Sequence, residues 1–80
     1  MNIGEAVKLR IIDLCKNNGI SVNKLATESG ITQSTLSNII SGRNNSTTIS
    51  TIKKICDGLG ITIQEFFASE LFNNLEQEIK

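Results

Sequence analysis

The sequence predicts an all-α protein, a compact bundle of five or six short helices around one hydrophobic core. Apolar residues, including the β-branched ones, recur at three- and four-residue spacing, which is the period of a helix and not of a strand. Hydroxyl or amide residues stand where helices would begin, and glycines stand where they would end. The chain has 80 residues, 39% of them hydrophobic, and no proline, which suits one small helical domain.

The first helix is predicted between two boundary signals. Asn2 and Glu5 form a capping-box pattern, and Gly19 is a C-terminal stop. The residues between them that recur at helical spacing are expected to face the core: Ile3, Val7, Ile11, Leu14 and Cys15.

Two shorter helices follow, each with a cap of its own. Ser21 is predicted to cap a helix that ends at Gly30. Thr32 is predicted to cap the next, helix 32–41, which stops at Gly42.

The fourth and fifth helices are predicted after a polar loop. Thr48 caps the fourth, whose last turn is weakened by Gly58, and Thr62 with Glu65 forms a second capping box that opens the fifth. The residues expected to face inward are Ile49, Ile52, Ile55, Cys56 and Leu59 in the fourth helix and Ile63, Phe66 and Phe67 in the fifth.

The chemical inventory argues against catalysis. The chain has no histidine, and Cys15 and Cys56 lack the spacing of a metal site, so both thiols are predicted to be small core residues. There is no nucleophile–base pair and no phosphate-binding loop. The sequence therefore predicts no enzyme, no catalytic residue, no metal, no cofactor and no small-molecule ligand.

Charge is segregated along the chain although its net value is zero. Residues 1–64 hold seven basic and four acidic groups, a net charge of +3, whereas residues 65–80 hold one basic and four acidic groups, a net charge of −3. A mildly basic head is compatible with a phosphate-bearing partner. No apolar run approaches the roughly 18–20 residues of a membrane span and no signal peptide opens the chain, so no membrane contact and a cytoplasmic location are expected.

The second and third predicted helices are joined only by Ser29-Gly30-Ile31, which forces a sharp angle between them and defines a helix-turn-helix. Several further elements stand in register around this unit: Leu25-Ala26, the run Thr32-Gln33-Ser34-Thr35-Leu36-Ser37, Ile39, Gly42 and Leu59-Gly60-Ile61-Thr62. With them, residues 3–67 closely resemble the lambda-repressor-like (Cro/repressor, XRE-type) DNA-binding domains.

The sequence departs from that family at two places. Val22 stands where the family commonly has a glutamine that supports phosphate contact. Cys15 and Ile40 stand where the family often pairs an arginine with a glutamate. We expect these two residues to be buried and in contact, an apolar replacement for the ion pair that does not threaten the fold.

Helix 32–41 has an uncharged polar face, and the resemblance implies that this face contacts DNA bases. An amide side chain bonds adenine bidentately, and hydroxyl-bearing side chains also contact thymine methyl groups. The expected base contacts are Gln33, Ser34, Ser37 and Asn38. The alternative is that these are ordinary solvated polar residues.

Contacts to the DNA backbone are expected around the same helix, because they position the protein while bases specify the site. The candidates are Ser21, Thr35, Arg43, Asn44 and Asn45. Ser21 is expected to act mainly as a helix cap and only secondarily as a phosphate ligand.

We expect the chain to divide into residues 1–68, a helix-turn-helix DNA-binding domain, and residues 69–80, a C-terminal helical segment. That segment carries Leu71, Phe72, Leu75 and Ile79, more apolar surface than one short helix hides on so small a core, and we expect it to mediate a homodimer. Alternatively it folds back and completes the core of its own chain. Whether it continues the fifth helix or breaks at Ser69 is left open by the sequence.

The expected function is that of a small bacterial or phage repressor or controller, which binds double-stranded DNA at a palindromic operator. One alternative is an antitoxin that binds both its operator and a toxin protein. A second is a protein-interaction module without DNA binding, because the basic head is weak and the third helix carries no charge.

Overall fold

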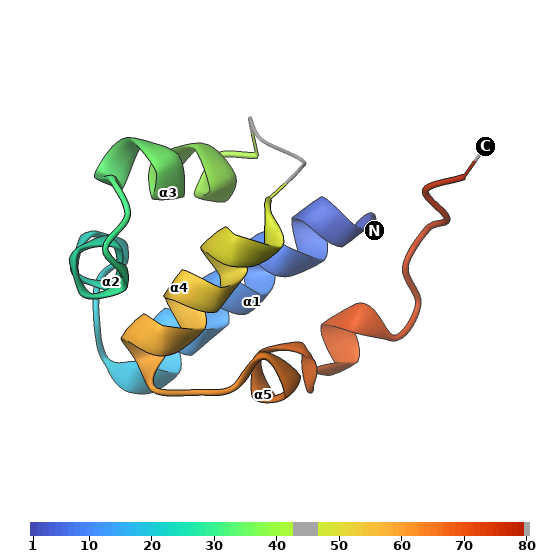
Figure 1. The fold of residues 1–80 in the computed structure, drawn as a ribbon. Coiled ribbons are helices and arrows are strands. Elements are labelled where there is room, and N and C mark those ends of the chain that lie inside the picture. Colours follow the sequence, from blue (N-terminus) through green and yellow to red (C-terminus); the bar gives the residue numbers. More distant parts are fainter. Residues whose placement is uncertain (43–46, 80) are drawn as a thin grey trace.

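The computed structural model describes residues 1–42 and 47–79. Its helices follow one another along the chain as α1 (Ile3–Asn18), α2 (Val22–Ser29), α3 (Gln33–Ile40), α4 (Ile49–Leu59), α5 (Ile63–Phe67) and the 3₁₀-helix η1 (Glu70–Phe72). The prediction of an all-α bundle is confirmed. Figure 1 shows α4 in front of α1, with α2 and α3 at one end and α5 and η1 along the opposite side. The closest helix packing is that of α4 on α2, and η1 packs on α1.

The helix starts are set locally, by side chains that accept a hydrogen bond from a backbone N–H three residues later. All five predicted N-caps are confirmed, and both predicted capping boxes are present. The caps are Asn2, Ser21, Thr32, Thr48 and Thr62. The helix ends match nearly as well, except that α3 ends at Ile40 with Ser41 as its cap.

One core joins the helices. Its fully buried large side chains come from α1, α2, α3, α4 and α5, namely Ile11, Leu25, Leu36, Ile55, Cys56 and Phe66. The predicted apolar stripe of α1 is buried from Val7 to Cys15, and its first residue, Ile3, is half-buried. Because every described α-helix contributes to this cluster, the helices α1 to α5 form a single packing unit.

At helix ends, some predicted core positions are exposed and others are only half-buried. Ile49 is 68% exposed, Ile63 is also exposed, and Ile40 is half-buried. Each lies at a helix end, where its apolar stripe extends beyond the neighbouring elements: Ile49 and Ile63 are the first residues of α4 and α5, and Ile40 is the last of α3. Spacing along a helix assigns a side chain to a face but does not tell how far along the helix that face is covered.

The C-terminal segment folds back onto its own chain. The fifth helix ends at Phe67, and Ser69 caps η1, which packs against α1. The ring of Phe72 lies 4.8 Å from that of Phe67. Further along, the backbone N–H of Glu76 donates to the carbonyl of Met1 at 3.1 Å, and its carboxylate lies 3.5 Å from the N-terminal amine. The segment beyond residue 68 therefore has its own contacts with α1.

Candidate nucleic-acid interface

The turn between α2 and α3 determines how α3 is presented. Gly30 adopts φ 67°, and its N–H donates to the last carbonyls of α2 while the N–H of Ile31 donates to Ala26 at 3.1 Å. This is a Schellman-type ending, which needs a left-handed residue and so favours glycine. The chain then turns sharply, and Figure 1 shows α3 crossing the end of α2. The result is a helix-turn-helix.

The inner face of α3 is anchored and its first turn is held. Leu36 and Ile39 are buried in the core. At the N-terminus, Thr32 Oγ1 accepts from the N–H of Thr35 at 3.1 Å, and the two hydroxyl oxygens lie 2.8 Å apart. The side chain of Thr35 is therefore oriented by the cap before any ligand arrives.

The outer face of α3 is polar, uncharged and exposed, as the sequence predicted. It consists of Gln33, Ser34, Thr35, Ser37 and Asn38. Among the described residues, the side chains of Gln33, Ser34, Ser37 and Asn38 form no hydrogen bond to the protein. Their donors and acceptors are thus available to a ligand that lies along α3.

The start of α2 lies in the same helix-turn-helix unit. Ser21 is exposed, and its hydroxyl accepts from the N–H of Lys24 at 3.0 Å. Lys24 in turn forms an ion pair with Glu28 at 3.1 Å. The expected backbone contacts Arg43, Asn44 and Asn45 lie outside the described residues.

Several basic residues of the N-terminal part have partners within the protein. Besides Lys24, Lys53 forms an exposed ion pair with Asp57. Arg10 is the most engaged: its Nε donates to the carbonyl of Phe66 at 2.7 Å, its Nη2 donates to that of Glu65 at 2.9 Å, and its side chain is only 13% exposed. The count of seven basic groups in residues 1–64 therefore overstates the cations free to meet phosphate.

The role of Arg10 was missed by sequence reasoning. Its carbonyl partners lie 55 and 56 residues further along the chain, on the last turn of α5. A cation at a helix C-terminus is favoured by the carbonyl dipoles there. No local pattern around Arg10 indicates this contact.

The two thiols lie in the core, as predicted, and are not bonded to each other. Burial raises the pKa of Cys15. Burial also raises the pKa of Cys56, against the opposing effect of Lys53. Both thiols are therefore poor nucleophiles at neutral pH. Within residues 1–42 and 47–79, no group of three or more acidic or cysteine side chains is placed to hold a metal ion.

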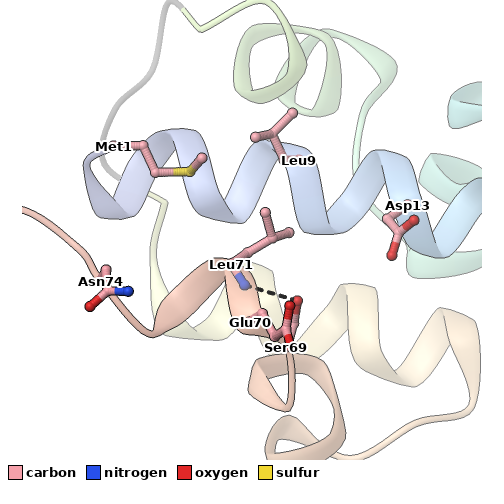
Figure 2. Close-up of a pocket in the computed structure, with 7 residues that line it drawn as sticks. All are labelled: Met1, Leu9, Asp13, Ser69, Glu70, Leu71 and Asn74. Carbon is pink, nitrogen blue, oxygen red and sulfur yellow. Dashed lines mark hydrogen bonds between the residues drawn. The ribbon is translucent and has the colours of Figure 1, made fainter.

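A groove lies on another side of the molecule, between α1 and the C-terminal segment (Figure 2). Its apolar lining consists of Met1, Leu9 and Leu71, and its polar lining of Asp13, Ser69, Glu70 and Asn74. The N–H of Leu71 donates to Ser69 Oγ at 3.3 Å, which holds η1 at the rim.

The four apolar residues predicted for dimerisation have different surroundings. Phe72 packs on Phe67, and Leu71 and Leu75 are half-buried. Ile79 is 86% exposed.

Among the described helices, none is long and apolar enough to cross a membrane.

Comparison with known proteins places these features in context. The family model described as Helix-turn-helix (HTH_3) matches residues 11–66. A crystal structure of prophage Lp1 protein 11 is similar to this chain, with a TM-score of 0.81 and 34% sequence identity over 94% of this chain and 100% of that one. No curated protein matches the sequence.

Proposed function

This chain belongs to the lambda-repressor-like (XRE-type) helix-turn-helix family of DNA-binding regulators, and from that premise we propose that it is a sequence-specific transcriptional regulator. In this proposal it is a small repressor or controller of bacterial or phage type. It acts in the cytoplasm, is not an enzyme and needs no cofactor.

The exposed face of α3 is the observation that carries the proposal. Gln33, Ser34, Ser37 and Asn38 offer donors and acceptors without partners among the described residues, on a helix whose opposite face is buried. Such a helix fits the major groove, where base edges present matching acceptors and donors. An ordinary solvated helix surface would usually carry Lys and Glu instead.

Contacts to the DNA backbone would flank α3. Thr35 and Ser21 stand at the first turns of α3 and α2, where backbone N–H groups and the helix dipole favour phosphate. Arg43, Asn44 and Asn45 follow α3 in sequence and complete the proposed set. The phosphate term is modest, because Arg10, Lys24 and Lys53 already have partners in the protein.

We also propose that the protein binds a palindromic operator as a homodimer through residues 69–80. Ile79 is largely exposed, and Met1 and Leu9 extend the apolar surface beside Leu71. Phe72 then anchors the segment to its own chain, and Leu71, Leu75 and Ile79 contribute the contact between copies. Two copies combine two weak half-site contacts about 10 base pairs apart.

Fluorescence anisotropy with the DNA upstream of the gene for this chain tests the proposal. A labelled duplex of that region should bind more tightly than a shuffled duplex, and Gln33→Ala and Asn38→Ala should each lose roughly 1–3 kcal/mol of discrimination at one base pair. Arg43→Ala should weaken binding to both duplexes and reduce the salt slope by about one.

Gln64→Ala is the matched control, because it removes an exposed amide from α5 instead of α3. It should leave DNA binding unchanged. Equal affinity of the unaltered protein for both duplexes, with circular dichroism showing that it is folded, would contradict the proposed function.

A further inference from the structure

We infer that α3 recognises adenine–thymine base pairs and that the half-site which it contacts is selected for A·T at the positions facing Gln33 and Asn38. This inference rests on the proposed function and adds the identity of the bases. It starts from the make-up of the exposed face of α3, which has two amides and several hydroxyls but no charged side chain.

The two amides favour adenine for a geometric reason. Adenine presents an acceptor at N7 beside a donor at N6, and a carboxamide presents a donor beside an acceptor, so both bonds form at once. Guanine presents two neighbouring acceptors, N7 and O6, and the oxygen of the carboxamide would face one of them without a proton between. For Gln33 and Asn38, this difference favours adenine on the order of 10-fold to 100-fold at each position.

Helix α3 lacks the side chains that select a G·C pair. Arg and Lys bond guanine bidentately, and Asp and Glu accept from the amino group of cytosine. From Ser21 to Gly42 the only charged residues are Lys24 and Glu28. They lie on α2 and are paired with each other at 3.1 Å.

The hydroxyl residues tolerate A·T pairs and contribute little selection of their own. A serine hydroxyl both donates and accepts, so Ser34 and Ser37 can bond any base edge.

The spacing of the amides assigns them to different base pairs. Gln33 and Asn38 are five residues apart, which is about 7.5 Å along a helix at about 1.5 Å per residue. They also project about 140° apart around the helix, at about 100° per residue. Because successive base pairs are about 3.4 Å apart, the two amides reach different base pairs, and the half-site is expected to contain two separate A·T pairs.

Selection from a random duplex library, followed by sequencing of the bound fraction, tests this inference. The unaltered chain should enrich A·T at two separate positions in each half-site. Gln33→Ala should remove the preference at one of them and Asn38→Ala at the other, whereas Gln64→Ala should leave both. Gln33→Arg should convert the first position from adenine to guanine, because arginine supplies two donors.

Arg43→Ala is run in parallel, because Arg43 follows α3 and is the next cation along the chain. A guanine preference that disappears with Arg43→Ala is assigned to that residue and leaves the adenine positions intact. Enrichment of G·C at the positions that respond to Gln33→Ala or Asn38→Ala would overturn the inference while leaving the proposed function standing. A folded protein that enriches no sequence would overturn the proposed function itself.

Discussion

Replacing Arg10 by alanine should destabilise the protein far more than its position on α1 suggests. The guanidinium joins α1 to the last turn of α5 through its Nε bond to Phe66 at 2.7 Å and its Nη2 bond to Glu65 at 2.9 Å. A third contact, 3.7 Å to Asp13, is long and half-exposed and should add little. The substitution thus leaves the end of α5 without its cation.

The two hydrogen bonds differ in burial, which sets the expected magnitude. A bond from a charged donor contributes about 1.5–3 kcal/mol, but the bond to Glu65 is exposed and water replaces most of it. The carbonyl of Phe66 is partly buried and lacks that replacement. Together with the lost packing of the side-chain stem, the free energy of unfolding should fall by about 2–4 kcal/mol. A domain of this size has only about 4–12 kcal/mol in total.

Urea and thermal unfolding, followed by circular dichroism, measure the effect. The melting temperature of Arg10→Ala should fall by roughly 10–25 °C, at about 4–8 °C per kcal/mol. The melting temperature of Arg10→Lys should lie between those of Arg10→Ala and the unaltered chain, because an ammonium keeps the charge but not the planar arrangement of donors. Lys53→Ala is the control, since it removes a basic residue whose ion pair is exposed. If Arg10→Ala lowered the melting temperature no more than Lys53→Ala, the bridge to α5 would not stabilise the fold.

Three further predictions concern packing, assembly and pH. Gly58→Ala should lower the free energy of unfolding, measured in urea, by about 1–3 kcal/mol, although alanine has the better helix propensity. The added Cβ would overlap the Ser29 hydroxyl and lie 3.0 Å from the Ser29 backbone nitrogen, and a more stable variant would contradict this reasoning. A chain that ends at Ala68 should sediment as a monomer at tens of micromolar where the full chain is a dimer, and a truncated chain that still dimerises would exclude the C-terminal segment as the interface. The urea concentration at which half of the protein is unfolded should decrease when the pH is raised above about 8.5. Burial raises the pKa of Cys15 and Cys56, so the thiols ionise at a lower pH in the unfolded chain than in the folded one. Equal midpoints at pH 7 and pH 10 would contradict this.

The sequence determined the helix starts and the polar face of the candidate site. A cap such as Thr32 accepts a hydrogen bond from a backbone N–H three residues later, so the adjacent sequence is enough to predict it. The exposure of Gln33, Ser34, Ser37 and Asn38 follows from the same helical period that buries the apolar side of α3. That these side chains contact bases stays a prediction, because contact depends on a partner that lies outside the chain.

The tertiary structure alone decided where distant segments meet. The same Gly58 that weakens α4 by propensity is required where α4 approaches Ser29 of α2, a contact no helical period encodes. It also decided that Ile49 is exposed and that Arg10 binds α5 instead of remaining free for phosphate. Caps and periodicity act over three or four residues, whereas these contacts join residues that are separated by between 29 and 56 positions in the sequence. Only the packing of the whole core brings such positions together.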